Sequence, residues 1–412
     1  MREGAPVRGG SATTQSSLLT GLPFSTRGEH LVGQEMFKVM ERAQKLERLG
    51  ERVYHLELGN PRMAPPPEIV EATVRAITAK HVGYAPMAGL VELREAVADR
   101  YRHRTGHEYE AKHVAISPAN LLISQFLDLT CNPGDRLALF TPAFPSYWAA
   151  ASHIGLEVVS VPLAPENGFH LGEVQIEEAI AARPKAVIVN SANNPTGAVY
   201  SRSALELLAR RCEEERIWLL SDETYAELSF GRPFFSLASC PAPQVVVLSS
   251  FSKLFSIPGF RTGSALAHPA VIEKLALSTS TLISCLPLFT QLGCLAGMSV
   301  MEPYVEQVRS HCNRVTAACA GAINRSSLLR CASPESGFYL FVDISETGLD
   351  DMTFCKQLLE EQHTAATPGR SFGPTWDTAI RIATCGQESD VMEGVRRVIA
   401  LAQELRGLRA AA

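Results

Sequence analysis

Short apolar runs alternate with helical patterns along most of the chain. The first run is VYHLELG, followed by helical patterns around EIVEATVRAI and LVELREAVADRY and then by HVAIS, LLISQFLDL, RLALF, EVVSVPL, AVIVNS, ALELLARRC, IWLLSD and QVVVLSS. Repeated alternation of strands and helices indicates an α/β domain built around a mostly parallel sheet. In such domains the ligand-binding loops follow the carboxyl ends of the strands.

Two other segments carry different patterns. Near the N-terminus, QEMFKVMERAQKLERLG predicts an amphipathic helix that ends at Gly50, with Met36, Phe37, Met40, Ala43 and Leu46 at helical spacing. From about residue 296 we expect a long helix, a β pair around GFYLFVDI, a helix around DMTFCKQLLEEQ, a short strand at AIRIATC and a last helix. This second pattern predicts a smaller α+β domain.

These patterns divide the chain into four parts. Residues 59–295 form the expected large domain, and residues 296–412 form the smaller one, completed by residues 31–58. Residues 1–30 are rich in Ser, Thr and Gly and lack the apolar region of a signal peptide, so we interpret them as a flexible arm. A transit peptide fits less well, because Glu3 and Glu29 interrupt its acid-poor pattern.

The overall composition excludes several classes of protein. Of the 412 residues 46% are hydrophobic and 20% are charged, and the formal net charge is -5. This balance is typical of a globular protein and leaves no basic surplus to attract nucleic acid or an anionic membrane. No apolar run approaches the roughly 18 residues that cross a bilayer. We therefore expect a cytoplasmic protein without nucleic-acid or membrane partners.

The ten cysteines and eleven histidines do not form a recognisable metal site. The cysteines are scattered singly, without a CxxC pair, which is typical of a reducing compartment and argues against a disulfide framework. The histidines show no HExxH spacing. We therefore expect no metal.

Four loops that follow predicted strands carry polar groups suited to an aromatic phosphate cofactor. They lie in HVAISPANLLISQ, AVIVNSANNPTG, IWLLSDETYAEL and QVVVLSSFSKLFSIPGFRTG. In the first, backbone donors at a strand-to-helix turn can hold a phosphate. The second also has the composition of an ordinary turn. In the third, Asp222 is either a helix N-cap or a buried counter-ion for a protonated nitrogen.

Lys253 stands in the fourth loop, among serines and apolar residues and directly after QVVVLSS. A surface lysine needs no such setting. A lysine held against apolar walls loses its charge more readily and becomes an amine nucleophile. The loop therefore predicts a reactive amine.

In this order and after these strands, NNPTG, SDETY and SFSKLFSIPGFR resemble the class I and II aminotransferases, which are fold type I pyridoxal phosphate enzymes. YAPMAGLVELREAVADRY, the NPGD turn, PAFPSY, PGRSFG and IRIA extend the similarity over most of the chain. The resemblance implies a three-layer α/β/α large domain with a smaller α+β domain. It also implies pyridoxal 5'-phosphate as cofactor, an amino acid substrate and a keto acid acceptor.

The resemblance gives catalytic and ring-binding roles to several residues. Lys253 is expected to form the internal aldimine and to move the α-proton through a quinonoid intermediate, tasks that suit an amine. Asp222 is expected to keep the pyridine nitrogen protonated, so that the ring withdraws electrons from the substrate. Asn194 and Tyr225 bind the 3-oxygen of the ring, and Phe144 stacks on its face.

The resemblance also implies how the phosphate is held. Its expected ligands are Ser250, Arg261, the backbone amides of Ala119 and Asn120, and Tyr84 from the neighbouring subunit. The planar fork of an arginine suits phosphate oxygens, which it meets in pairs. A phosphate held across subunits makes a homodimer the active unit.

Three residues are implied to bind the substrate. Arg381, in a short strand of apolar and small residues, resembles the family arginine that clamps the α-carboxylate, and Asn194 is also implied to contact the substrate. Gly59 in LELGNP resembles the glycine that leaves room for this carboxylate. The alternative for Gly59 is an ordinary turn glycine.

The chain departs from the family pattern in two segments. The phosphate loop usually begins with a glycine pair, whereas this chain has Pro118, which supplies no amide hydrogen, and continues to Leu122 without glycine. Dicarboxylate aminotransferases also contribute an arginine from the partner chain in the segment that here reads ALSTSTLISCLPLFTQ. This segment has no Arg or Lys and aligns Ser280 with that position, so aspartate is a poor match as substrate.

Two enzymatic functions are consistent with the residues, and a third, non-enzymatic one is disfavoured. We expect transamination of an amino acid to a keto acid. The alternative is elimination or replacement at the β or γ carbon, cyclisation or oxidation of an amino acid or an S-adenosylmethionine-like substrate, which begins in the same way. A non-enzymatic regulator built on this domain needs a DNA-binding module ahead of the fold, and about 30 residues do not supply one.

Overall fold

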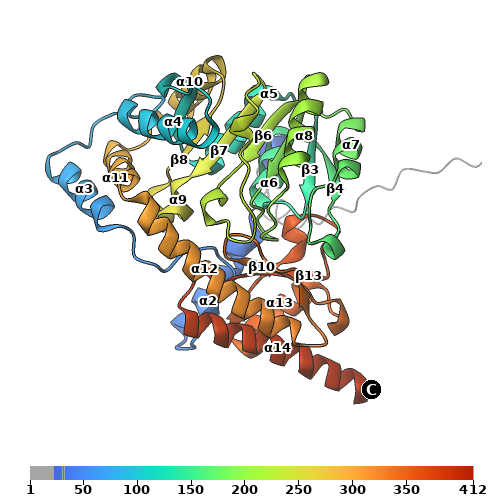
Figure 1. Ribbon diagram of the computed structural model, residues 1–412. Helices are drawn as coiled ribbons and strands as arrows, with labels where there is room; N and C mark the ends of the chain where they lie inside the picture. The colour runs from blue at the N-terminus through green and yellow to red at the C-terminus, as the bar shows by residue number, and fades with distance from the viewer. Residues whose placement is uncertain (1–22, 30, 32, 412) are drawn as a thin grey trace, which may run out of the picture.

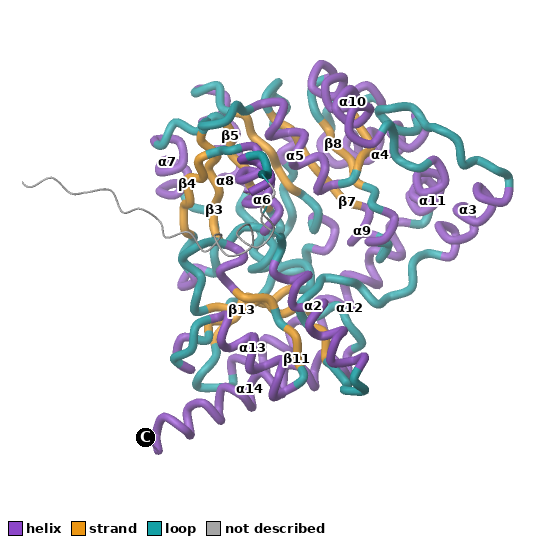
Figure 2. Tube along the Cα trace, turned by 180° about the vertical axis from the view of Figure 1, so that it is seen from behind, coloured by secondary structure: helices purple, strands orange, loops and turns teal. Residues whose placement is uncertain are grey.

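The computed structural model describes residues 23–29, 31 and 33–411, so most of the arm expected at 1–30 lies outside the described residues. Figure 1 shows a large upper part around one sheet and a smaller lower part that ends in the C-terminal helix. Figure 2 shows the same division from behind.

A seven-stranded sheet in the order β2-β8-β7-β6-β5-β3-β4 forms the centre of the larger part. Its strands are β2 (Val114–Ser117), β3 (Arg136–Thr141), β4 (Glu157–Pro162), β5 (Ala186–Asn190), β6 (Trp218–Asp222), β7 (Val245–Ser250) and β8 (Gly263–Leu266). β8 runs antiparallel to both of its neighbours, and the adjacent pairs among β7, β6, β5, β3 and β4 are parallel. The prediction of a mostly parallel sheet is confirmed.

Strand β8 was not predicted, because its sequence GSAL has little of the β-branched and aromatic character that marks a strand. Its backbone pairs with β2 on one side and with β7 on the other. These two ladders provide hydrogen-bond partners for the amide and carbonyl groups of β8. Its extended conformation therefore depends on its place between two other strands and not on its own residue types.

Helices cover both faces of this sheet. They are α3 (Pro67–Thr78), α4 (Val91–Thr105), α5 (Ala119–Thr130), α6 (Pro145–Ile154), α7 (Glu173–Ala181), α8 (Arg202–Glu214), α9 (Phe251–Leu254), α10 (Pro269–Ile283) and α11 (Leu288–Met298), and α1 (Thr26–Glu29) precedes them. In β5, Val187 and Val189 share a core with α4, α7 and α8, whereas Ile188 packs with α5, α6 and α10. Since side chains alternate along a strand, the three layers follow directly from this sequence.

The smaller part combines the C-terminal segment with residues near the N-terminus. Its four-stranded sheet has the order β12-β13-β10-β9, and a separate parallel pair joins β1 to β11. Its strands are β1 (Tyr54–His55), β9 (Arg330–Cys331), β10 (Tyr339–Asp343), β11 (Thr364–Ala365), β12 (Thr367–Pro368) and β13 (Ala379–Ala383), and its helices are α2 (Glu35–Arg48), α12 (Met301–Asn324), α13 (Asp351–Gln362) and α14 (Glu388–Ala411). The β1–β11 pair ties the N-terminal segment to this part of the molecule.

Helix α2 confirms the helix predicted near the N-terminus and differs from the expected pattern in one residue. Gly50 follows the helix in a left-handed conformation with φ +93°, which favours glycine and ends the helix. Met36, Val39 and Ala43 form the buried face, whereas Phe37 remains 47% exposed. Val39 therefore replaces Phe37 in the apolar stripe, and Phe37 points elsewhere.

The carboxyl ends of the parallel strands all lie on the side of the large sheet that faces the smaller part. Asn190 pairs with Asp222 at the ends of β5 and β6, and Ser250 ends β7 next to them. Short 3-10 helices complete the chain at Ala111–His113, Pro165–Asn167, Ala226–Leu228, Leu237–Ser239, Pro258–Phe260, Ser345–Thr347 and Gly369–Phe372. No helix within the described ranges has the length and apolar character needed to span a membrane.

Candidate active site

A cavity of about 510 Å³ lies at this carboxyl edge, between the large sheet and strands β10 and β13. It is lined by Gln34, Met36, Phe37, Leu58, Gly59, Asn60, Ala119, Asn120, Ile123, Phe144, Asn190, Asn194, Asp222, Thr224, Tyr225, Ser250, Ser252, Lys253, Pro258, Arg261, Tyr339 and Arg381. All of the predicted site residues except Tyr84 belong to this lining. The volume lies in the usual range for small-molecule sites.

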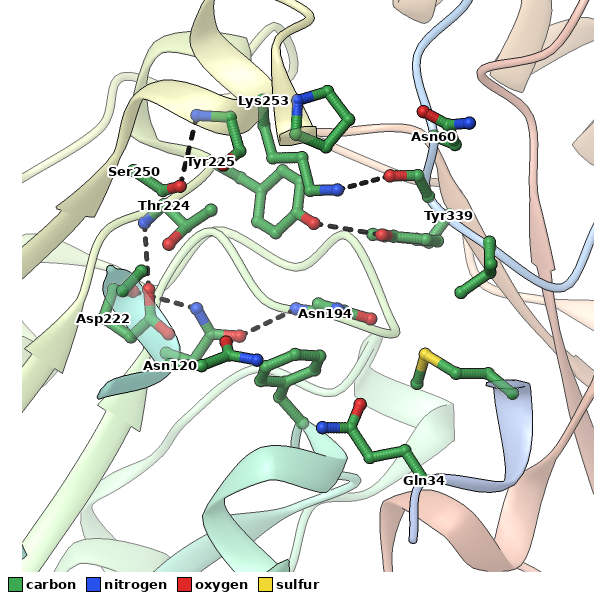
Figure 3. Close-up of a pocket in the computed structure, with 18 of the residues that line it drawn as sticks. Gln34, Asn60, Asn120, Asn194, Asp222, Thr224, Tyr225, Ser250, Lys253 and Tyr339 are labelled. Atoms are coloured by element: carbon green, nitrogen blue, oxygen red, sulfur yellow. Dashed lines mark hydrogen bonds between the residues drawn. The ribbon is translucent and has the colours of Figure 1, made fainter. Parts of the chain in front are cut away.

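Lys253 extends into the cavity from α9, directly after β7 (Figure 3). Its Nζ donates a hydrogen bond to the backbone carbonyl of Gly59. Burial lowers the pKa of Lys253 to about 8, because removal from water disfavours the charged form. The amine therefore reaches its neutral, nucleophilic form at a lower pH than a surface lysine does.

Asp222 lies at the end of β6 and is 5% exposed. Its carboxylate accepts a hydrogen bond of 2.6 Å from the Tyr147 hydroxyl and one of 3.0 Å from the Thr224 amide. Burial raises the pKa of Asp222, and these two hydrogen bonds oppose the rise. A cationic partner in the cavity would stabilise the ionised carboxylate further.

Asn190 and Asn194 fix the loop that follows β5. The Asn190 side chain donates to the Asp222 carbonyl at 2.8 Å, and its Oδ1 accepts from the Asn194 amide at 2.8 Å. Asn194 is thereby held beside Asp222, with its own side chain in the cavity (Figure 3).

Tyr225 and Tyr339 meet at the centre of the cavity, with 3.0 Å between their hydroxyl oxygens (Figure 3). Burial raises the pKa of both phenols, so both stay neutral. Gly59 lies directly beside this pair, because a Cβ atom there would be 1.8 Å from the Tyr339 hydroxyl oxygen. Glycine is therefore required at this position because the Tyr339 side chain leaves no space for a Cβ atom, and not because the backbone is left-handed.

Arg381 is a residue of β13, is 1% exposed and contributes to the lining of the cavity. Its guanidinium donates to the Glu57 carbonyl, to Thr367 Oγ1 at 3.2 Å and to Asn194 Oδ1 at 3.4 Å. It also lies 4.5 Å from the centre of the Tyr339 ring. Its Nε has no hydrogen-bond partner among the described residues. A carboxylate ligand would supply the missing acceptor, since buried donors are normally paired.

The opposite end of the cavity is suited to a phosphate. Ala119 and Asn120 begin the twelve-residue helix α5, where the first amides lack intrahelical partners. Pro118 precedes them, so its missing amide hydrogen leaves these two donors in place. Ser250 Oγ accepts from the Ser252 amide at 3.3 Å, which keeps its hydrogen free to be donated. The exposed Arg261 adds a positive charge.

Two predicted residues lie at the margins of this arrangement. Phe144 precedes α6 and lines the cavity, with its ring edge-to-face against Tyr147. Tyr84 lies outside the cavity in the connection between α3 and α4 and is 90% exposed. Because it was assigned to the site of a neighbouring subunit, its role stays a prediction.

Sequence reasoning missed four contributors to the site. Tyr147 and Asn190 hold Asp222, Tyr339 contacts Tyr225, and Gln34 lines the cavity next to α2. Tyr147 stands in PAFPSY, and Tyr339 is a hydroxyl in an apolar strand, so both carried a local signal. Asn190 and Gln34 gave none. No group of metal-binding side chains is found in the described part of the chain.

The comparisons with known proteins agree on one family. The family model described as aminotransferase class I and II matches residues 51–398. An arginine–pyruvate transaminase of Pseudomonas aeruginosa is 30% identical over 91% of this chain and 96% of its own length, and a probable aspartate/prephenate aminotransferase of Aquifex aeolicus is 28% identical over 93% and 99%. The structure of Thermus thermophilus aspartate aminotransferase with maleate superimposes with a TM-score of 0.87, at 28% identity over 92% of this chain and all of the other.

Proposed function

The chain belongs to the class I and II aminotransferase family and is a pyridoxal phosphate-dependent enzyme, and from this premise we propose the residues that carry out its transamination of an amino acid to a keto acid. The observation that carries the assignment is the placement of an amine with a lowered pKa, Lys253, in one cavity with Asp222 and Arg381.

The residues of the cavity fit the cofactor. Pyridoxal phosphate supplies an aldehyde that condenses with amines and a protonated pyridine ring that withdraws electrons from the carbon bearing the amino group. Asp222 would hold the ring nitrogen, and Asn194 and Tyr225 the 3-oxygen. The helix amides of Ala119 and Asn120, with Ser250 and Arg261, would hold the phosphate, and Phe144 would pack on the ring.

Lys253 is the proposed nucleophile and base. An amine with a pKa of about 8 is partly neutral at physiological pH, and only the neutral form can attack a carbonyl or accept a proton. The Gly59 carbonyl accepts a hydrogen bond from Nζ and so orients the amine toward the cavity.

Arg381 is the proposed clamp for the substrate carboxylate. Its other nitrogens donate to Glu57, Thr367 and Asn194, so the guanidinium is held in one orientation, and its buried Nε has no partner among the described residues. A fixed donor loses little conformational freedom when the substrate binds.

We also propose that the active unit is a homodimer in the cytoplasm, with Tyr84 completing the phosphate site of the partner. In support, large apolar side chains are exposed in α3, in the connection that carries Tyr84 and at the end of α10. They are Val74, Ile77, Val82, Leu282 and Ile283. Ala85 donates to Cys285 Sγ at 3.3 Å, so the segment of Tyr84 lies against the end of α10. Exposed apolar groups of this kind mark interfaces.

The test is an absorbance spectrum of the purified holoenzyme, followed by addition of amino acids with and without a keto acid. We expect the band of lysine-bound cofactor, its loss in Lys253→Ala, its conversion by an amino acid to the pyridoxamine form, and its return with a keto acid.

Two results would contradict the proposal. A cofactor band that persists in Lys253→Ala would remove Lys253 from its role. A long-lived coloured intermediate without pyridoxamine product would favour the elimination, replacement, cyclisation or oxidation alternative.

A further inference from the structure

We propose that the enzyme takes an amino donor with an uncharged, mainly apolar side chain and passes its amino group to a keto acid whose side chain is also uncharged. This inference rests on the proposed function and names its substrate class. It would separate this enzyme from the relatives whose names specify arginine or aspartate.

Each charged side chain that lines the cavity already has a proposed role other than binding the side chain of the substrate. Within the described residues, the charged lining side chains are Asp222, Lys253, Arg261 and Arg381. In the proposed function Asp222 and Arg261 would hold the cofactor, Lys253 would act as nucleophile and base, and Arg381 would bind the carboxylate that every amino donor has. No charged group of this lining is left to pair with a charged substrate side chain.

A charged side chain would therefore lie against this lining without a counter-ion. A charge that is removed from water without a compensating partner is strongly disfavoured. Acidic and basic donors should bind this cavity poorly for the same reason.

The wall next to the carboxylate clamp is neutral and mostly apolar. Met36 Sδ lies 4.0 Å from an Arg381 nitrogen, so the start of α2 is adjacent to the clamp. Phe37 also lines the cavity and is 47% exposed, which places an aromatic ring at its opening instead of in the helix packing. Leu58 adds a third apolar group. A substrate held by Arg381 would find these side chains beside it.

Gln34 adds a neutral polar group to this wall. Figure 3 shows it on the side of the cavity opposite Lys253 and Asn60. Its Nε2 donates to Ser146 Oγ at 3.0 Å, so the amide is held in place. The segment 276–291 next to the proposed subunit interface contains no Lys or Arg that a partner subunit could add.

The same cavity receives both substrates in turn, since the keto acid is converted by the reverse reaction. The argument on charge therefore applies equally to the acceptor. Pyruvate should be preferred to oxaloacetate and 2-oxoglutarate.

The first test measures kcat/KM of the holoenzyme for leucine, methionine and phenylalanine against aspartate, glutamate, arginine and lysine, with pyruvate as acceptor. We expect the best neutral donor to exceed every charged donor by about 100-fold or more. A charged donor that equals or exceeds the neutral ones would overturn the inference and leave transamination intact. Failure of every amino acid to convert the bound cofactor would instead contradict the proposed function.

The second test compares Phe37→Ala with Lys38→Ala. Phe37 lines the cavity, whereas Lys38 is exposed on the same helix and pairs with Glu35. We expect Phe37→Ala to lower kcat/KM for leucine about 10-fold and to change the value for alanine little, because alanine lacks the side chain that Phe37 would contact. Lys38→Ala should leave both values unchanged. An unaltered leucine-to-alanine ratio in Phe37→Ala would exclude α2 as the specificity wall.

Discussion

At the scale of single residues, Lys253 shows how the fold prepares an amine for reaction at a cost in stability. Its pKa is lowered from 10.5 to about 8 by burial. Below pH 8 the amine is protonated in both states, so the folded state carries the full cost of a desolvated charge. Between pH 8 and 10.5 the unfolded chain holds the extra proton, so stability rises with pH across this window, by roughly 3 kcal/mol.

Replacement of Lys253 by methionine should therefore stabilise the cofactor-free protein at pH 7, by up to roughly 3 kcal/mol, because a neutral side chain of similar size avoids this cost. The gain should shrink toward pH 10.5. Urea unfolding at several pH values measures it, with the exposed Lys45→Met as control. A gain of equal size at every pH would show that the charge of Lys253 is not its cause.

Tyr339 is the second residue with a measurable role, because it contacts both Tyr225 and Arg381. Its hydroxyl lies 3.0 Å from that of Tyr225, and its ring lies against the Arg381 guanidinium. Tyr339→Phe should lower kcat about fivefold while KM changes less than about twofold, since one hydrogen bond is lost and the ring contact is kept. It should also shift the pH titration of the cofactor absorbance, through Tyr225.

Tyr109→Phe is the matched control for Tyr339→Phe, since the Tyr109 hydroxyl donates to the Ala238 carbonyl at 2.7 Å outside the cavity. If Tyr339→Phe leaves the pH titration of the cofactor absorbance unchanged and raises KM, the role of Tyr339 would be to position Arg381 and not to act through Tyr225.

At the scale of elements, the sequence predicts what is local and misses what depends on tertiary neighbours. The apolar runs located β3 to β7, and each of β5, β6 and β7 delivers a site residue at its end. VYHLELG contains only the two-residue strand β1, because its partner β11 is equally short. The contact between Tyr147 and Asp222 joins α6 to β6 across 75 positions, and no local pattern contains it.

The connection after β6 offers a prediction at this scale. The buried Glu223 accepts hydrogen bonds from Ser221 at 3.0 Å, from Ser236 at 2.7 Å and from the Leu237 amide at 2.9 Å. It thereby fixes the segment next to Asp222. Burial raises its pKa from 4.5 to about 7, so the folded state holds an extra proton between these values. Stability should fall by roughly 3 kcal/mol as pH rises through this window.

Glu223→Gln removes this titration. Its amide oxygen can still accept from Ser221 and from the Leu237 amide, whereas its amide nitrogen would donate to Ser236 Oγ, which reverses that hydrogen bond. We expect the variant to have a higher Tm than the wild type at pH 8 and a smaller dependence on pH between 4.5 and 7. Thermal unfolding at pH 5 and pH 8 compares the two proteins. If the Tm of the wild type and of Glu223→Gln falls by the same amount between pH 5 and pH 8, groups other than Glu223 cause the pH dependence.

At the scale of the whole molecule, the cavity lies where two parts of the chain meet. Lys253, Asp222 and the first residues of α5 belong to the larger part, whereas Arg381 and Tyr339 belong to the smaller part. We therefore keep the division into residues 31–58, 59–295 and 296–412 as a proposal. A substrate held by Arg381 and a cofactor held by Asp222 would bridge the two parts, so ligand binding should stabilise the whole chain.

The proposed dimer makes a further prediction, because Tyr84 and Lys253 would then act in one site from different subunits. Tyr84→Ala and Lys253→Ala should each have low activity alone. After the two variants are unfolded and refolded together, half of the dimers should be mixed, and one of their two sites should have both residues intact. Recovery of about a quarter of wild-type activity per subunit is expected. Mixing without any recovery, although light scattering shows dimers, would place Tyr84 outside the partner's site, because a residue acting within its own subunit cannot complement a lysine missing from the other.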